Sequence, residues 1–484
     1  MFSPQSIPME TMDPNNTQLN PSLRQSNDTD NYDENVNLSN DNIIYGEEEC
    51  SINNNLHTSM SDSNISYCGI KSNSILSAIL NICASAVGGG CFTFPWIISN
   101  IGILNSTFIF LVVSLCIYYS LDLLRSFVVD TKYFSFSLMT ETTLGKKWLM
   151  VYSFSSFFYY ISININYLSL LYSIFRSLFL SHTTLNGFIF LLTTCSIEIF
   201  LCLYTSKIGK LNLLSVITMF NFLIIVLLSL IQGIYSSIEN DYISAKFSPK
   251  NLFNPLDNVS GSQIFFNSIT ACIKYIYGYS YNCSFPTLIG TLKNVNDSNS
   301  KKVHNLSFII ICSSYFIIGL FGYLIKEEVP AVLFKEYEET SEGDNLSIWI
   351  RIIIFIFLLT LLPNRYIVIR DGYKLLIGKD KLTYKKDLLI TTLTFAFSNG
   401  IVFFTQEYCV EMDIFTLLVS TFGGLFGVII GFFLPVINYA AVNGKRKLKT
   451  LIGYLITGLF LVIGLFAFGY SFYDLYQSYE DEKE

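Results

Sequence analysis

The sequence has few charged residues and lacks the residue clusters that soluble enzymes use. Only 14% of its 484 residues are Asp, Glu, Lys or Arg, compared with about 25% in ordinary soluble domains. Its three histidines, at positions 57, 182 and 304, are far apart in the chain, and its eleven cysteines form no C-x-x-C pair. It has no phosphate-binding loop and no nucleophile elbow. We therefore expect no metal site, no disulfide framework, no cofactor and no nucleic-acid partner.

Apolar residues make up 51% of the chain and aromatic residues 16%, which indicates a membrane protein. Residues 1–70 carry eleven acidic residues and one basic residue, Arg24, so the rest of the chain has a net charge of +3 although the whole chain has −7. This stretch is rich in Asn, Asp, Ser and Glu and has no helical or strand period, so we expect a disordered acidic tail. It does not resemble a signal peptide, and we expect the first span to direct insertion into the bilayer.

Eleven stretches are apolar over the roughly 20 residues that a helix needs to cross a bilayer. They predict a transmembrane domain over residues 71–475, followed by a short tail, 476–484. Lys and Arg gather in every second connection between spans, as is typical of cytoplasmic loops. This alternation predicts a multi-pass protein with a cytoplasmic N-terminus and an extracytosolic C-terminal tail. The stretches are 74–100, 103–128, 148–180, 186–205, 211–235, 262–290, 305–325, 347–369, 387–406, 412–437 and 449–472.

The first span contains three successive glycines, in "NICASAVGGGCFTFPW" at 81–96. Each Gly costs about 1 kcal/mol relative to Ala inside a helix. Because contiguous glycines point around a helix and not along one packing stripe, we expect this helix to open. The sixth span has a matching interruption at 277–280, in "YIYGYSYN". Interruptions five spans apart predict an all-α, LeuT-like 5+5 inverted repeat with eleven transmembrane helices, the eleventh lying outside the repeats.

Three sequence motifs resemble motifs of one known family. They are "ILNICASAVGGGCFTFPWIISNIGIL" in the first span, "YNCSFPTLIGTLKN" at the end of the sixth, and "LLPNRYIVIRD" in the eighth, where Pro363 and Arg365 form P-x-R. Together they resemble the amino acid/auxin permease family, in particular its system A and system N branch, over about residues 72–472. The resemblance implies secondary transport of an amino acid by alternating access, either by proton symport or without coupling.

The resemblance also implies that the substrate binds to the opened first and sixth spans. Amide groups at the first interruption would face the substrate carboxylate, at the positive end of the following half-helix. Freed carbonyl groups at the second would face its ammonium group or a cation. Sodium-coupled members hold Na⁺ with an Asn shortly before the glycine pair, where this chain has Ala84, so H⁺ is favoured over Na⁺ as the coupling ion. The expected substrate contacts are Ser85, Gly88, Gly89, Gly90, Tyr277, Gly278, Ser280, Tyr281 and Asn282.

Two charged residues lie deep within predicted spans, where a charge costs about 2.5 to 3.5 kcal/mol. Lys274, about twelve residues into the sixth span, is either a proton carrier or a structural cation beside the opened backbone. Glu198, in the fourth span, is either a proton acceptor or the structural partner of a buried cation such as Lys274 or Arg365. Asn81 and Thr360 are the nearest replacements for the missing sodium ligands. Lys274, Glu198, Asn81 and Thr360 are therefore the candidate coupling residues.

Two other functions fit the same residues. A sodium-coupled neutral amino acid carrier would use Asn81 and Thr360 as sodium ligands, and an amino acid sensor would signal through residues 1–70. An intramembrane enzyme has only Glu198 and Lys274 for its chemistry and is disfavoured. The membrane is either the plasma membrane or a vacuolar or lysosomal membrane.

Overall fold

The structure is a computed structural model, and helices dominate the residues that it describes. The predicted tail, 1–70, and Ser280 lie outside those residues. The described residues are 74–179, 184–206, 211–239, 246–253, 261–279, 281–325, 329, 345–377, 383–408, 419–444 and 447–481.

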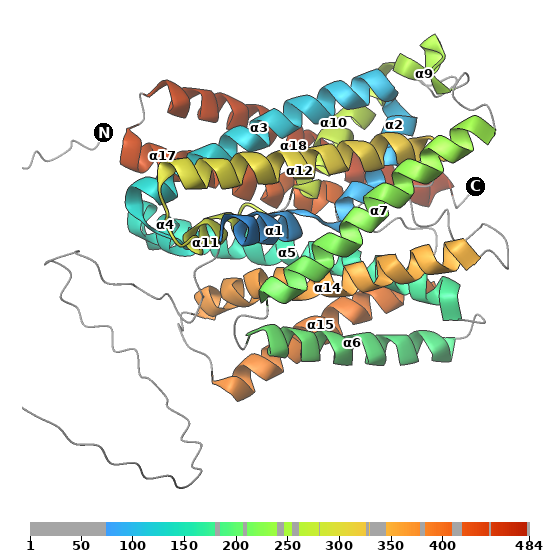
Figure 1. The fold of residues 1–484 in the computed structure, drawn as a ribbon, viewed down its shortest axis with the longest axis horizontal. Helices are drawn as coiled ribbons and strands as arrows, with labels where there is room; N and C mark the ends of the chain where they lie inside the picture. The colour runs from blue at the N-terminus through green and yellow to red at the C-terminus, as the bar shows by residue number, and fades with distance from the viewer. Residues whose placement is uncertain are drawn as a thin grey trace, which may run out of the picture. The chain divides into compact units, whose positions relative to one another are not determined.

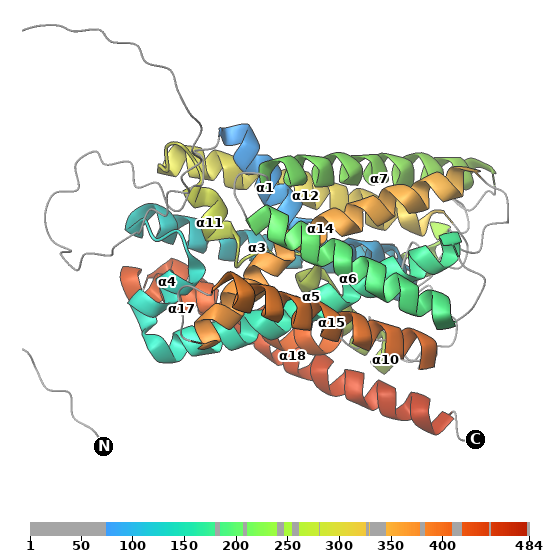
Figure 2. The ribbon, with the colours of Figure 1, turned by 90° about the horizontal axis from the view of Figure 1, so that it is seen from below.

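Helices occupy each of the eleven predicted stretches (Figure 1, Figure 2). They are α1 (Ile75–Ala86), the 3-10 helix η1 (Gly89–Thr93) and α2 (Phe94–Ile101) in the first stretch, then α3 (Ile103–Thr131), α5 (Lys146–Phe179), α6 (Thr184–Ser206), α7 (Leu211–Glu239), α10 (Gly261–Gly278) with α11 (Phe285–Gly290), α12 (Asp297–Tyr323), α14 (Asn345–Ile377), α15 (Tyr384–Tyr408), the π-helices η3 (Val419–Gly427) and η4 (Ile429–Phe433) with α17 (Leu434–Asn443), and α18 (Leu448–Asp481). Two short helices, α4 (Phe136–Leu144) and α9 (Pro249–Phe253), lie in connections. Within the described residues, seven helices are long and apolar enough to cross a bilayer, and one bent pair makes an eighth candidate span.

At four of the five equivalent positions of the two predicted repeats, the helices pack against each other. Helix α3 contacts α12, α5 contacts α14, α6 contacts α15, and the first-span pieces η1 and α2 contact α10. The pairs α5 with α14 and α6 with α15 can be followed in both views of the ribbon (Figure 1, Figure 2). Such pairing is what two repeats related by an internal two-fold axis produce.

Both predicted interruptions are confirmed. In the first span, α1 ends at Ala86, Val87 and Gly88 are extended, and the two halves of the span are bent by 53°. In the sixth span, α10 ends at Gly278 and α11 begins only at Phe285, so this break starts two residues later than the predicted 277–280. A proline stands in the first turn of each second half, at 95 and 286, where its missing N–H costs no helical hydrogen bond. The break in the first span is shorter than the three glycines suggest, because a 3-10 turn begins at Gly89.

Helix α18 is longer than its apolar stretch. The sequence predicts a span over 449–472 and a tail from 476, whereas the helix continues to Asp481. The extra residues, "YQSYED", contain no Gly or Pro to end it. Hydropathy predicts where a bilayer ends, but helical hydrogen bonding continues until the chain supplies a stop signal.

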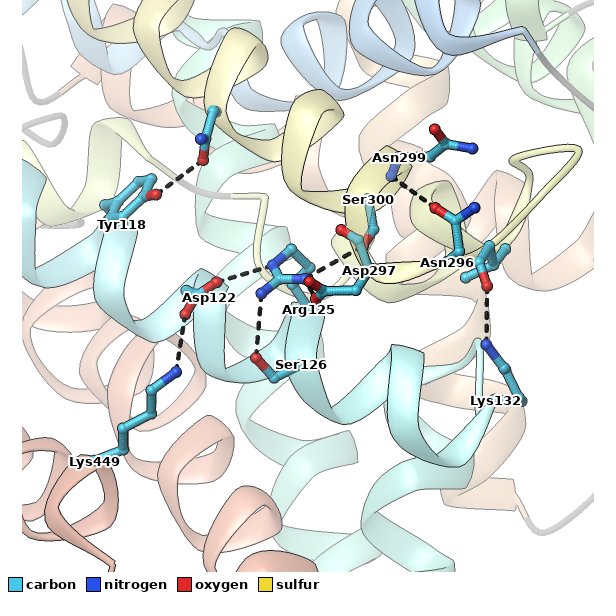
Figure 3. Close-up of polar contacts among 12 residues, drawn as sticks. Tyr118, Asp122, Arg125, Ser126, Lys132, Asn296, Asp297, Asn299, Ser300 and Lys449 are labelled. Carbon is cyan, nitrogen blue, oxygen red and sulfur yellow. Dashed lines mark hydrogen bonds and ion pairs between the residues drawn. The ribbon is translucent and has the colours of Figure 1, made fainter.

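Ion pairs join three helices at one end of the bundle (Figure 3). Arg125 of α3 binds Asp122 on its own helix, with Nε and Oδ1 2.8 Å apart, and Asp297 at the start of α12, with Nη1 and Oδ1 2.5 Å apart. It also donates to the Ser300 hydroxyl at 3.3 Å, and Lys449 of α18 lies 3.6 Å from Asp122. We call these five residues the Arg125 network.

Candidate functional site

The two broken spans meet at their breaks. A Cβ atom built on Gly90 would lie 3.2 Å from the Cα atom of Gly278, a tight contact with backbone that glycine avoids. The Tyr315 hydroxyl of α12 lies 2.9 Å from the carbonyl oxygen of Ala86 and 2.8 Å from that of Gly278. Because Ala86 and Gly278 are the last residues of α1 and α10, one hydroxyl proton serves the open carbonyl ends of both half-helices.

Gly88 makes room for two side chains from other helices. A Cβ atom at this position would collide with the Tyr167 hydroxyl of α5 and lie 3.3 Å from Nη2 of Arg365 of α14. The φ angle of Gly88 is −149°, an extended value open to any residue, so glycine is needed here for space. The Tyr167 hydroxyl lies next to the Gly89 amide and to Arg365. A tyrosine and an arginine therefore border the amide that the sequence predicts to face a carboxylate.

Arg365 reaches the carbonyl end of α1. Its side chain is buried, and Nη2 donates to the carbonyl oxygens of Val87 at 3.2 Å and Ala86 at 3.4 Å. Tyr315 of α12 donates to the same Ala86 carbonyl. The end of α1 thus has two side-chain donors, one of which is charged.

Residues of the second break are tied to neighbouring helices. The Tyr277 hydroxyl accepts a hydrogen bond from Nδ2 of Asn166 of α5 at 2.6 Å. The Asn282 amide donates to the carbonyl oxygen of Gly431 in η4 at 3.1 Å, and Tyr281 packs its ring edge against Phe285. These contacts hold the second break between α5 and the tenth span.

A small cavity lies beside the second break. Its lining includes Tyr159 and Tyr160 of α5, Tyr279 and Asn282 of the break, and Gly431 of η4. A Cβ atom added to Gly431 would meet no atom within 4 Å, so this glycine faces open space. Open volume therefore lies next to the polar groups of the second break.

The remaining expected substrate and sodium residues lie around this centre. Ser85 is half-buried in the last turn of α1, and Asn81 is buried one turn before it. The buried Thr360 hydroxyl donates to the carbonyl oxygen of Phe357 on its own helix at 2.8 Å. The structure therefore brings together Gly88, Gly89, Gly90, Tyr277 and Gly278, while Thr360 bonds its own backbone.

The two candidate charges lie in different surroundings. Lys274 is buried one turn before the end of α10, with Nζ 3.7 Å from the centre of the Trp96 ring of α2, a cation–π contact. Glu198 is buried in α6, where Oε2 accepts a hydrogen bond from the Asn399 amide of α15 at 3.1 Å. The described structure therefore pairs Glu198 with Asn399 and not with Lys274 or Arg365, the two partners expected from the sequence.

Sequence reasoning missed Tyr167 and Tyr315. Tyr167 follows Asn164 and Asn166 in "SININY", in the middle of the apolar third span. Polar residues within a span face the interior of the bundle, so this cluster was a usable signal for a site on α5. Tyr315 carried no comparable signal, because its neighbours in the seventh span are ordinary apolar and small residues.

Comparisons with known proteins agree with this architecture. Residues 71–477 match the family described as transmembrane amino acid transporter protein. Similar solved structures include a manganese transporter from Eremococcus coleocola, at 14% identity and a TM-score of 0.58, over 85% of this chain and 91% of that chain. Another is MhsT in complex with L-phenylalanine, at 15% identity and a TM-score of 0.54, over 82% of this chain and 98% of that chain.

At these identities the solved structures show the fold alone, and it is the expected LeuT-like fold with interrupted first and sixth helices. The chain is a multi-pass membrane protein and a secondary transporter, not an enzyme. By the match of its residues 71–477, it belongs to the transmembrane amino acid transporter protein family.

Proposed function

We propose that this transporter carries amino acids by alternating access and binds them between the two breaks. The observation that carries the proposal is the meeting of the breaks, with Gly90 against Gly278 and one Tyr315 hydroxyl shared by two half-helix ends. Amides at the start of the second half-helix suit a carboxylate. Carbonyls at the end of α10 suit an ammonium group. An α-amino acid carries both groups on one carbon and can bridge the two.

The proposed contacts are the glycines 88–90, Ser85, and the residues Tyr277, Gly278, Ser280, Tyr281 and Asn282 at the second break. We add Tyr167, because its hydroxyl lies beside the Gly89 amide. Asn164, one turn before Tyr167 on α5, supports a polar ligand: it is fully buried, and its amide nitrogen and oxygen have no hydrogen-bond partner in the described part of the chain. Buried polar groups are normally satisfied, and a bound substrate would satisfy this one.

For coupling, we propose H⁺ or no ion in preference to Na⁺. Lys274 is the residue to test, because a proton lost from its ammonium group would break the contact with Trp96 that joins the first and sixth spans. We assign Glu198 a structural role between α6 and α15, through Asn399. The sodium-coupled alternative depends on Asn81 and Thr360.

For topology, we propose eleven crossings within 71–475 and a cytoplasmic N-terminus, in the plasma membrane or in a vacuolar or lysosomal membrane. The Lys and Arg residues in every second connection support this orientation.

The test is uptake of a ¹⁴C-labelled mixture of L-amino acids into proteoliposomes containing the full chain, under an imposed pH gradient, an imposed Na⁺ gradient or neither. We expect uptake in the absence of Na⁺, with or without acceleration by the pH gradient. Uptake that occurs only with a Na⁺ gradient would contradict the coupling proposal. No uptake under any gradient, from protein that elutes as a single folded species, would contradict amino acid transport.

Lys274→Met tests the proton role. We expect the variant to lose accumulation driven by a pH gradient and to keep exchange of internal for external amino acid. Lys246→Met is the matched control, because Lys246 is also buried and lies 4.2 Å from the centre of a tyrosine ring, that of Tyr323. Full pH-driven accumulation by Lys274→Met would leave Lys274 a structural cation.

A further inference from the structure

Glu198 is a fully buried carboxyl group that lies away from the two breaks. It stands on α6, well inside the fourth predicted span, 186–205. Leu192 and Phe200 of the same helix are more than half exposed, as are Leu393 and Phe397 of α15. In a bilayer, exposed apolar side chains of this kind contact lipid tails. The carboxyl group therefore lies between two helices whose outer faces meet hydrocarbon and not water.

The amide of Asn399 on α15 determines which oxygen of Glu198 is a hydrogen-bond acceptor. Its Nδ2 donates to the carbonyl oxygen of Phe395 at 2.9 Å and to Oε2 of Glu198 at 3.1 Å. Its Oδ1 accepts a hydrogen bond from the Thr194 hydroxyl of α6 at 3.1 Å. A reversed amide would turn its oxygen toward the Phe395 carbonyl, so the nitrogen is the atom that faces Glu198. Oε2 is therefore an acceptor, and Oε1 is the oxygen that can carry a proton.

Among the described residues, none brings a positive charge to this carboxyl group. Oε1 has no hydrogen-bond partner in the described part of the chain, and Oε2 has the one amide donor. The described titratable groups close to Glu198 are the thiols of Cys195 and Cys202 on α6. Arg370 of α14 lies near Cys202, but it is paired with Asp387 of α15, with Nη1 and Oδ2 3.7 Å apart. The nearest cation thus has a carboxylate of its own.

These surroundings suit a neutral acid and not a carboxylate. A charge buried among apolar groups needs a counter-ion or several hydrogen-bond donors, and Glu198 has one neutral donor. The protonated form avoids the cost of a buried charge within a span. Its carbonyl oxygen, Oε2, accepts the hydrogen bond from Asn399, and its hydroxyl group is a donor. The single amide contact is then enough for the oxygen that receives it.

We propose that Glu198 is a proton-binding site, which holds a proton on Oε1 and joins α6 to α15 as a neutral acid. The two helices lie side by side in both views of the ribbon (Figure 1, Figure 2). Because no described basic group lies beside Oε1 to accept the proton, the proton stays bound, and Glu198 offers no counter-ion to a cationic ligand. Glu198 acts by fixing one helix against the other and is a positioning residue. This inference concerns helices away from the breaks and does not rest on the proposed function.

Infrared difference spectroscopy reads the charge of this carboxyl group directly. The full chain and its Glu198→Gln variant are reconstituted in lipid, and their spectra are subtracted at neutral pH. We expect the difference to contain the C=O band of a protonated carboxylic acid, above the amide I band. The bands of an ionised carboxylate in its place would overturn the proposal. Asp297→Asn is the control, because Asp297 is 71% exposed and paired with Arg125, so its difference spectrum should contain carboxylate bands.

A second test compares two variants by thermal unfolding in detergent. Glu198→Gln keeps an oxygen acceptor for Asn399 and has no charge, whereas Glu198→Leu removes the acceptor. We expect Glu198→Gln to unfold at the wild-type midpoint and Glu198→Leu to unfold at a lower one, because a buried amide donor is left unpaired. A lower midpoint for Glu198→Gln, or a failure of this variant to fold, would contradict the proposal, since a neutral side chain of the same shape should replace a neutral acid.

A third measurement separates a bound proton from a bound metal cation. The unfolding midpoints of the wild type and of Glu198→Gln are measured in choline chloride, NaCl and KCl at equal ionic strength. A neutral acid does not attract a cation, so we expect the two midpoints to agree in all three salts. If Na⁺ or K⁺ raises the wild-type midpoint and not that of Glu198→Gln, the carboxyl group is an ionised cation site, and the proposal is wrong. These three measurements need no transported substrate, so a failure of the proposed function would leave their outcome unchanged.

Discussion

Two buried arginines of this transporter bind opposite kinds of partner. Arg125, at one end of the bundle, binds the carboxylates of Asp122 and Asp297 and ties α3 to α12 (Figure 3). Arg365, at the breaks, binds the carbonyl oxygens of Ala86 and Val87. A carboxylate neutralises an arginine, whereas a carbonyl group only solvates it. We infer that the Arg125 network serves mainly to hold helices together, and that Arg365 serves mainly to hold the open carbonyl end of α1. Changes at the breaks should lower transport, and changes in the network should lower stability.

Gly90→Ala should have the largest effect and should act on transport. Its Cβ atom would lie 3.2 Å from the Cα atom of Gly278, and backbone cannot move away as a flexible side chain can. We expect uptake to fall about 100-fold, equal to about 2.7 kcal/mol. Gly458→Ala of α18 is the control, since its Cβ atom would meet nothing within 4 Å. The initial rate of uptake per reconstituted molecule measures the effect, and equal rates for the two variants would show that the breaks do not need this close approach.

Arg125→Gln should have the next largest effect and should act on stability. Arg125 is buried, but its partners are partly exposed, with side-chain exposures of 22% for Asp122 and 71% for Asp297. The expected loss in free energy of unfolding therefore lies between the values for exposed and for buried ion pairs, at about 2 kcal/mol. Thermal unfolding in detergent should show a lower midpoint, with uptake per folded molecule kept within about twofold.

Lys132→Gln is the control for this variant. It removes one positive charge at the same end of the bundle, from an exposed side chain that bonds the carbonyl oxygen of Val295 (Figure 3). Its unfolding midpoint should stay close to that of the wild type. A transport defect in Arg125→Gln with an unchanged midpoint would mean that the network belongs to the transport cycle.

The sequence alone predicted both breaks and the helix order, because their signals are local. Three contiguous glycines at 88–90, and Gly278 followed by Pro286, are local signals for a break, whereas the single Pro363 stays inside the continuous helix α14. Apolar length and the distribution of Lys and Arg then predicted the order of the spans. Local signals in the chain, combined with the known architecture of transporters with paired interruptions, are therefore enough to predict the fold of the membrane domain.

The side chains that complete the candidate site could not be predicted in this way. Arg365 stands in a P-x-R motif, but its contact with Ala86 joins residues 279 positions apart, and no local pattern shows such a partner. Tyr315 is one of 31 tyrosines. Its role depends on which side of α12 packs against the first and sixth spans, and a local sequence pattern does not show this. Nor did the sequence point to Asn399 as a partner of Glu198, because a buried carboxyl group can accept a hydrogen bond from an amide as well as pair with a cation.

Tyr315→Phe should have a moderate effect and should act on transport. It removes the hydroxyl shared by the carbonyl groups of Ala86 and Gly278 and keeps the ring. A lost hydrogen bond of this kind is worth about 1 kcal/mol, so we expect uptake to fall by roughly five- to tenfold. Tyr323→Phe, later on the same helix, is the control. If both variants transport equally well, the end of α1 depends on Arg365 alone.

Asp297→Asn should have the smallest effect and should act on stability through salt-sensitive attraction. The Asp297 side chain is 71% exposed, and an ion pair that exposed contributes about 0.5 kcal/mol. We expect a small decrease in the unfolding midpoint relative to the wild type at low salt. Because the Debye length falls to about 3 Å at 1 M salt, the two midpoints should converge there. If the difference persists at 1 M salt, or equals that of Arg125→Gln, then Asp297 is the main anchor of Arg125, and the network depends on a bond between α3 and α12 that solvent does not screen.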